Sequence, residues 1–382
     1  MGLRHARAVG VLESMDLGGV WVSTADGDRR RLSWDRVRAL RGPVAADAEP
    51  MLAIGHDLWR ARTRLERGDG INAEAGFERV LLAIDRRKTG EPPSPFGDGA
   101  SETESVASEG LLRCRLRRGA GLASVSPWLQ LVASDGVNTS RFRGYLPLAP
   151  AETQLIPALP PIWVPGPSVA AFAGSSPDLR LASSSTGTGP AATLGLLYRA
   201  SAKAAAGDHE GARTTLAAIG ARQRDSGEVI DRDAAFVAAI VGTLAHDTQA
   251  ESELRSIRVL ADLEPWRRAW ADAAIGVGTV TGPGEDRERL LRGAALLADV
   301  RVRSDRLLPK LAGTALAYAA FGLERAGDVE GAARIAADLD ASFPGHAALR
   351  WSAMQHLLER GITSSERRQG QTAVRRNGNT EG

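Results

Sequence analysis

The sequence is almost free of cysteine: Cys114 is the only one in 382 residues. A single thiol cannot form an intramolecular disulfide or assemble a cysteine-based zinc site. Stability must therefore come from packing, and a hydrophobic content of 43% is ample for a buried core. Cys114 stands among Leu111, Leu112 and Leu116, which predicts a buried, inert thiol.

Long apolar runs are missing as well. No stretch approaches the roughly 20 apolar residues that a membrane-spanning helix needs. The first ten residues also lack the apolar region of a signal peptide. As written, the chain is predicted to be cytoplasmic and without membrane insertion. The alternative is an exported protein whose true start lies upstream and encodes a signal peptide.

Lysine is scarce, with only Lys88, Lys203 and Lys310, and 48 basic residues nearly balance 46 acidic ones. The arginine clusters at 29–31, 115–118 and 367–368 are too short to make a surface that tracks phosphates. Nucleic acid is therefore not the expected partner.

Motifs for metal or cofactor chemistry are absent from the sequence. None of the six histidines has the i, i+4 spacing of a helical zinc site. The glycine-rich run 276–284 lacks the Lys-Ser/Thr pair of a phosphate-binding loop, so it is predicted to be a turn between helices. We therefore assign no catalytic, cofactor-binding or metal-binding residue and expect no cofactor.

Residues 8–42 have the pattern of a small β module. Val20 and Val22 alternate with other residues, and an Asp26-Gly27 turn precedes Leu32 and Trp34. Alternation around an Asp-Gly turn predicts a hairpin. The end of this segment resembles the last strand and turn of SH3-like modules, which have about five strands, whereas about three can be placed here. The module is either a minimal meander or truncated.

From residue 50 onward the hydrophobic period becomes helical. Ile54, Leu58, Ala61 and Leu65 share one helix face. Gly68-Asp69 then interrupts the pattern, because glycine can take the left-handed conformation that ends a helix and aspartate can cap the next one. The same pair recurs at 207–208 and 327–328, and more loosely at 119–120. The sequence thus predicts antiparallel helix hairpins.

These hairpins resemble the tetratricopeptide repeat family. Counted from the Gly-Asp turns, the small residues of the motif fall on two sets of alanines, and Pro344 matches its closing proline. The alanines are Ala61, Ala200 and Ala320 in the first helices and Ala73, Ala212 and Ala332 in the second helices. The family's aromatic in the first helix is replaced by Arg64, Lys203 and Leu323, and the spacing is not a constant 34 residues. The resemblance implies a mainly α fold, with helix pairs stacked as an α-solenoid.

The chain is predicted to contain five regions. A β module (8–42) precedes a first helical block (50–133), which contains a Pro/Ser-rich loop at 90–104. A Pro-rich insertion with a Ser/Gly linker (134–192) separates the first helical block from a second one (193–360). A disordered tail (361–382) follows. Prolines at the density of the insertion forbid regular helix. Its apolar residues predict extended backbone lying on the helices, either as structural filler or as a lid that competes with a partner peptide.

Stacked helix pairs create a long grooved surface. Together with the lack of a catalytic constellation, this predicts a non-enzymatic protein that mediates protein–protein interaction or scaffolding, with a protein or peptide partner. The alternative is an enzyme whose active site is assembled only in three dimensions. The candidate groove or lid contacts are Trp163, Tyr145, Arg64 and Lys203.

Overall fold

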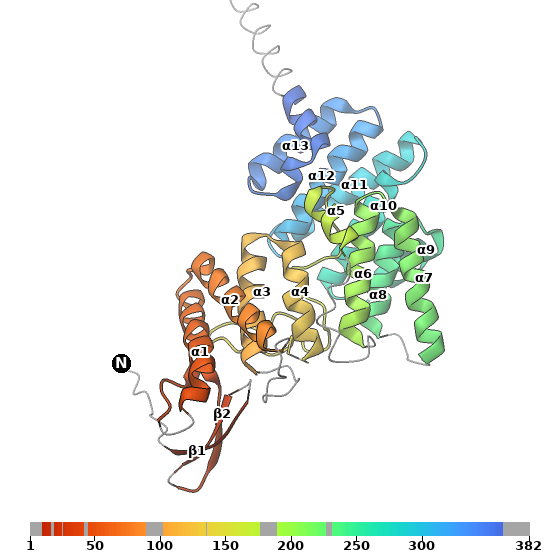
Figure 1. Cartoon of the computed structure of the whole chain (residues 1–382). Coiled ribbons are helices and arrows are strands. Elements are labelled where there is room, and N and C mark those ends of the chain that lie inside the picture. The colour runs from red at the N-terminus through yellow and green to blue at the C-terminus, as the bar shows by residue number, and fades with distance from the viewer. Residues whose placement is uncertain are drawn as a thin grey trace, which may run out of the picture. The chain divides into compact units, whose positions relative to one another are not determined.

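The structure is a computed structural model, and it describes residues 10–16, 19–24, 26–41, 45–88, 102–134, 136–175, 189–226 and 231–361. The described chain is mainly helical, with a three-stranded antiparallel sheet near the N-terminus (Figure 1). It divides into two compact units. Unit 1 is Met1–Gln154 with Leu179–Ala192, and unit 2 is Leu155–Asp178 with Thr193–Gly382.

The sheet of unit 1 contains β1 (Gly10–Asp16), β2 (Gly19–Thr24) and β3 (Arg29–Leu32), with β2 in the centre. Val20 and Val22 of β2 are buried, as the alternation predicted. The short helix η1 (Trp34–Arg36) follows β3, and the buried Trp34 indole donates to the carbonyl of Asp16 at 2.8 Å. The hairpin signals in the sequence therefore located the sheet correctly.

Four helices complete unit 1: α1 (Ala45–Glu66), α2 (Gly70–Lys88), α3 (Glu102–Arg118) and α4 (Gly121–Ala133). The helices α1 and α2 form one hairpin and α3 and α4 a second, and α3 packs against both α1 and α2. The sheet lies near one end of α1 (Figure 1), and η1 packs against the middle of α1 at Gly55. A Cβ at Gly55 would lie 2.3 Å from the carbonyl oxygen of Trp34, so this contact requires glycine.

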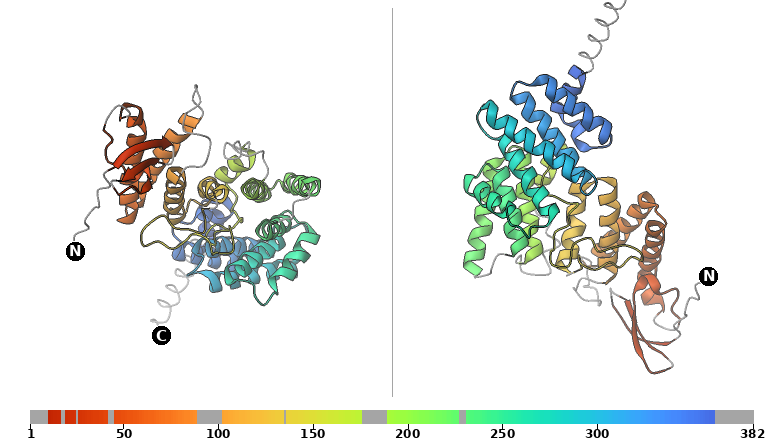
Figure 2. Two further views of the ribbon diagram at one scale, coloured as in Figure 1. Left: turned by 90° about the horizontal axis from the view of Figure 1, so that it is seen from below. Right: turned by 180° about the vertical axis from the view of Figure 1, so that it is seen from behind.

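Unit 2 contains nine labelled α-helices. They are α5 (Pro167–Gly174), α6 (Pro190–Ala205), α7 (His209–Ser226), α8 (Arg232–Leu244), α9 (Thr248–Arg258), α10 (Pro265–Thr281), α11 (Arg287–Ser304), α12 (Pro309–Arg325) and α13 (Val329–Ser342). The turn η3 (Ala347–Arg350) and a helix over 352–361 follow. Neighbouring helices pack in chain order from α7 to α13, and the first helices of successive pairs, α8, α10 and α12, also touch (Figure 2).

The predicted Gly-Asp turns are helix terminators in the structure. Gly68, Gly207 and Gly327 have φ between 82° and 88°, the left-handed region. The next amide in each turn bonds to the carbonyl five residues back, as in Asp328 to Leu323 at 2.9 Å. The aspartate side chain then caps the following helix, as in Asp208 Oδ1 to the Gly211 amide at 2.9 Å. One dipeptide thus ends one helix and begins the next.

The turn between α8 and α9 follows the same plan without glycine. His246 takes the left-handed φ of 61°, and it is the only non-glycine residue with positive φ in the described chain. The Asp247 amide bonds to the Gly242 carbonyl at 2.9 Å, and its carboxylate caps the amides of Gln249 and Ala250. The sequence predicts helices over 231–246 and 249–261 here, in agreement with α8 and α9. It does not mark this turn as one of the Gly-Asp type, because histidine stands at the glycine position.

The prediction that 276–284 is a turn was wrong in its first half, since α10 continues to Thr281. Gly276 and Gly278 lie inside the helix, where it approaches its neighbours closely. A Cβ at Gly278 would lie 2.8 Å from the Thr243 carbonyl oxygen of α8, and one at Gly276 would lie 2.6 Å from Leu297 of α11. These glycines serve packing, and the connection between α10 and α11 is 282–286, of which only 282–284 belongs to the predicted turn.

Several predictions fall partly outside the described residues: the Pro/Ser-rich loop up to residue 101, the Ser/Gly linker at 176–188 and the tail after 361. The residues 102–104, predicted to be loop, belong to α3. No helix among the described residues is long and apolar enough to cross a membrane.

The turn geometry predicts the effect of Gly327→Ala. A side chain at φ of +82° is strained, so we expect a loss of about 1 kcal/mol in the free energy of unfolding, measured by urea denaturation. Gly345→Ala is the matched control, because Gly345 lies in the next turn, has no positive φ and has open space around it. Equal effects of the two substitutions would contradict the proposed role of Gly327.

Candidate functional site

The expectation that the insertion 134–192 contains no regular helix was wrong in part, because α5 occupies Pro167–Gly174 and α6 begins at Pro190. Each of these helices has a proline at its start, where no helical N–H is needed.

The Pro-rich segment 155–166 of unit 2 contains no helix or strand and is mostly buried. Leu155, Ile156, Leu159 and Ile162 are each at most 3% exposed, and Trp163 is 8% exposed. Such backbone cannot form helical or sheet hydrogen bonds, so its carbonyl groups need other donors. We call this stretch the inner segment.

Three aromatic side chains supply those donors from three different helices. The Tyr198 hydroxyl of α6 donates to the Leu159 carbonyl at 2.6 Å, and the Trp270 indole of α10 donates to the Pro157 carbonyl at 3.1 Å. The Tyr318 hydroxyl of α12 donates to the Trp163 carbonyl at 2.8 Å. Burial raises the pKa of both tyrosines, which keeps these hydroxyls protonated as donors. The first helices of three hairpins therefore hold one extended chain.

Trp163, singled out from the sequence, anchors the inner segment. Its indole donates to the Ser201 hydroxyl of α6 at 2.7 Å, and the same hydroxyl donates to the Tyr198 carbonyl. The Trp163 and Tyr198 rings meet edge to face, with centroids 6.1 Å apart. Trp163 is thus bound within its own unit on both its ring face and its polar edge.

A partly open pocket of about 170 Å³ lies beside Trp163. Its main lining residues are Trp163, Pro165, His209, Tyr318, Phe321 and Trp351. The Trp351 ring contacts both Tyr318 and Phe321, with centroids 5.3 and 5.1 Å apart. We call this the aromatic pocket. Its shape and lining suit a proline ring or an apolar side chain, because aromatic walls are the usual receptors for proline-rich chains.

A histidine pair lies at the wall of the aromatic pocket. The rings of His209, at the start of α7, and His246, in the α8–α9 turn, have centroids 4.3 Å apart. Burial, and then the neighbouring His209, lower the pKa of His246 to about 4. Burial also lowers the pKa of His209, whose Nδ1 is buried without a hydrogen-bond partner in the described chain. Both rings are neutral near pH 7.

Lys203 and Arg64 occupy equivalent places in two hairpins, four residues before the turn glycine. Lys203 Nζ lies 3.5 Å from the Gly211 carbonyl oxygen, and Arg64 donates to the Asn72 carbonyl at 3.3 Å. Arg115, four residues before Gly119, likewise donates to the Ala123 carbonyl. In each case the acceptor lies eight residues later, on the second helix. The basic residue four positions before the turn glycine thus ties the two helices of its hairpin.

Tyr145 lies in unit 1, in the segment that follows α4. Its hydroxyl donates to the Leu65 carbonyl of α1 at 2.9 Å, and its ring contacts Phe142, which in turn contacts Phe77. The structure brings Tyr145 and Arg64 into unit 1 and Trp163 and Lys203 into unit 2. The four candidates therefore do not belong to one site within either unit.

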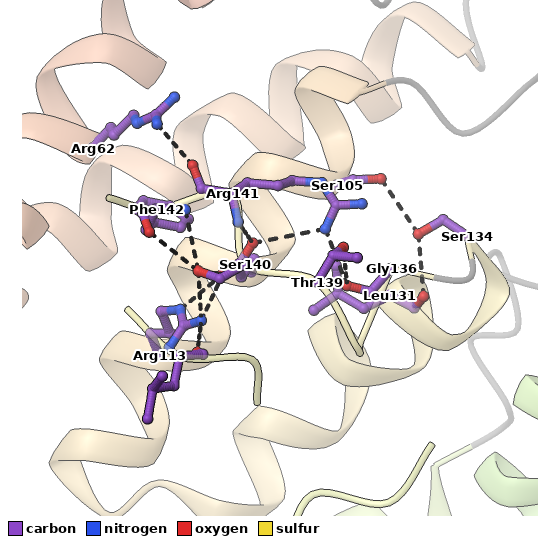
Figure 3. Close-up of polar contacts among 12 residues, drawn as sticks. Arg62, Ser105, Arg113, Leu131, Ser134, Gly136, Thr139, Ser140, Arg141 and Phe142 are labelled. Carbon is purple, nitrogen blue, oxygen red and sulfur yellow. Dashed lines mark hydrogen bonds and ion pairs between the residues drawn. The ribbon is translucent and has the colours of Figure 1, made fainter. Parts of the chain in front are cut away.

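A buried polar network in unit 1 was not visible in the sequence. Glu109 of α3 is fully buried, and its carboxylate accepts from Arg113, from the Ser140 hydroxyl and from the Arg141 amide. Figure 3 shows Arg113 directed toward Ser140, and Arg62 donating to the Arg141 carbonyl at 2.7 Å. Arg62 also pairs with Asp35 beside the sheet at 3.0 Å. This network fastens the segment 136–146 and the sheet to the helices.

The described residues contain no group of three or more His, Cys, Asp or Glu side chains that could hold a metal ion. Cys114 is buried, as predicted, and burial raises the pKa of its thiol to about 12. A thiol with that pKa carries little thiolate at neutral pH.

Neither a family model, a curated protein nor a solved structure matches this chain.

Removal of the Tyr318 hydroxyl tests whether these hydrogen bonds hold the inner segment in place. Tyr318→Phe leaves the Trp163 carbonyl without its buried donor, so we expect a loss of about 1–3 kcal/mol in stability. Hydrogen exchange measured by mass spectrometry should become faster in 155–166. Tyr145→Phe, which removes a hydroxyl bond in unit 1, is the control and should leave exchange in 155–166 unchanged. Unchanged exchange in the Tyr318 variant would refute this role.

The histidine pair predicts acid sensitivity. The folded-state pKa of His246 lies below its ordinary value of 6.5, so the unfolded chain binds more protons as the pH falls. This contribution to stability is complete above pH 6.5 and is lost as the pH falls toward about 4. His246→Asn keeps a residue that tolerates positive φ and should make the fall shallower. Urea denaturation at several pH values between 4 and 6.5 measures the free energy of unfolding. If this free energy falls equally steeply with pH in the unaltered chain and in the His246→Asn variant, the histidine pair is not responsible.

Proposed function

We propose that this chain is a non-enzymatic helical-repeat protein that binds a protein partner through the first-helix face of unit 2. In this proposal its hairpins stack as a tetratricopeptide-like α-solenoid. The contacts of α8 with α10 and of α10 with α12 support that arrangement, since they join successive first helices.

The observation that carries the proposal is the way the face holds its own inner segment. Donors from α6, α10 and α12 bind backbone carbonyls, while apolar and proline side chains of the segment are buried between them. Recognition of backbone by side-chain donors, with side-chain pockets for specificity, is the mode by which grooves bind extended peptides. A face built in this way is suited to extended polypeptide.

The aromatic pocket is the part of this face that the inner segment leaves open. Trp163 and Pro165 of the inner segment line one part of this pocket, and Phe321 and Trp351 line another. A partner chain bearing a proline or an aromatic residue would extend the line of the inner segment into this pocket. The groove or lid contacts predicted for Trp163 and Lys203 belong to this proposal. Tyr145 and Arg64 lie in unit 1 and are not part of the proposed face.

Site-specific cross-linking tests the proposal. A photoreactive phenylalanine analogue in place of Phe321 should cross-link a discrete protein in extracts of the source cells. Mass spectrometry should place the cross-link in an extended segment with proline or aromatic residues. The control carries the analogue at Trp59, which is 43% exposed in unit 1. Equal products from both positions, or none from position 321, would count against a partner at this pocket.

A further inference from the structure

A second cavity of unit 2, unconnected with the inner segment, has about 290 Å³ of volume. It lies between the N-terminal turn of α10 and the C-terminal turn of α11 with the loop that follows. Its main lining residues are Trp266, Arg268, Asp272, Val300, Arg303 and Leu307. We call it the arginine pocket. By volume it could hold about ten water molecules, or a ring or short alkyl chain with one polar group.

Two N–H donors in the lining have no acceptor. The indole Nε1 of Trp266 and the Nε of Arg268 are buried and have no hydrogen-bond partner within the described chain. Buried donors are nearly always bonded, so two of them on residues that line the same pocket indicate a missing acceptor nearby. Arg268 is otherwise held in place, because its Nη2 donates to the Leu260 carbonyl at 3.1 Å.

The charges of the pocket favour an anion. Asp272 is its only acidic lining residue, and that carboxylate is 1% exposed and bonded to both Arg258 and Arg303. Because Asp272 is paired with those two arginines, Arg268 has no ion pair in the described chain. The first turn of α10 contains no acidic residue and adds the positive end of its helix dipole.

Apart from Arg303 and Ser304, the rest of the lining is apolar. Leu307 is 72% exposed at its rim and Leu260 is 45% exposed beside Arg268, while Val300 is buried in the wall. Exposed leucines beside a cavity indicate a surface that an apolar ligand would cover. One cation with one indole donor suits a monoanion better than a phosphate, which needs more donors.

We propose that the arginine pocket binds a monocarboxylate with an apolar body, an aryl or short alkyl carboxylic acid. The carboxylate accepts from the Arg268 guanidinium and the Trp266 indole after a small side-chain movement opens both donors to the cavity. The apolar body packs on Val300 and Leu307. This site is independent of the partner surface proposed above.

Fluorine NMR on the full chain tests the site, with 4-fluorophenylacetate as the probe and 4-fluorophenylacetamide as its neutral analogue. We expect the acid to bind and the amide to bind about tenfold more weakly or worse, since a hydrogen bond to a charged group contributes about 1.5–3 kcal/mol. Arg268→Gln should weaken binding of the acid by a similar factor. Trp266→Phe, which keeps a ring but removes the N–H, should weaken it by about threefold to tenfold.

Arg306→Gln is the matched control, because Arg306 is an exposed arginine next to the pocket that does not line it. It should bind the acid like the unaltered chain. Thermal unfolding of each variant checks that the fold is intact. Equal binding of acid and amide, or full affinity in the Arg268 variant, would overturn the proposal. So would failure of both 4-fluorophenylacetate and hexanoate to bind the unaltered chain.

Discussion

The organisation of unit 2 depends on the hydrogen bonds between aromatic side chains of the helices and the backbone of the inner segment. A proline-rich chain cannot satisfy its carbonyl groups through secondary structure, and a buried carbonyl without a donor costs about 1–3 kcal/mol. Tyr198, Trp270 and Tyr318 remove that cost at three points along the segment. The inner segment can therefore be part of the core.

The need to supply donors to these carbonyl groups explains why tyrosine and tryptophan occupy core positions where a helix bundle would otherwise have leucine. Trp270 and Tyr198 are among the largest fully buried side chains, and each reaches a carbonyl that no helix backbone could reach. In unit 1, charged side chains bind the backbone of the irregular segment 136–146. Glu109 accepts from the Arg141 amide, and Arg62 donates to the Arg141 carbonyl. Two segments that lack secondary structure are thus fixed by different chemistry.

Local signals in the sequence predicted much of this fold. A glycine that must take positive φ, followed by a capping aspartate, marks a hairpin without any knowledge of tertiary contacts, which is why three of these turns were located to the residue. The signals that predicted the strands, alternation around an Asp-Gly turn, were equally local. The helices on either side of His246 were predicted, but the turn itself was not recognised, because a histidine replaces the glycine that marks the other turns. Gly276 and Gly278 were misassigned because their role appears only where α8 and α11 approach.

The candidate site was predicted in part. Trp163 stood out as an aromatic among prolines. Its ring partner Tyr198 and its hydrogen-bond donor Tyr318 lie 35 and 155 residues away, and only folding brings them to it. Arg64 and Lys203 were noticed as departures from a family pattern, which carries no information on the carbonyl groups that they reach.

The energetics of the inner segment limit how a partner could use the first-helix face. Burial of a large apolar side chain contributes about 1.5–3 kcal/mol, so the five buried side chains from Leu155 to Trp163 contribute about 7–15 kcal/mol. A peptide of micromolar affinity gains only about 8 kcal/mol. It could displace the inner segment only by reproducing nearly all of its contacts. A partner that occupies the aromatic pocket incurs no such cost, and it still uses the Tyr318 and Trp163 rings that the inner segment has already ordered. On this face, addition to the inner segment is therefore favoured over its replacement.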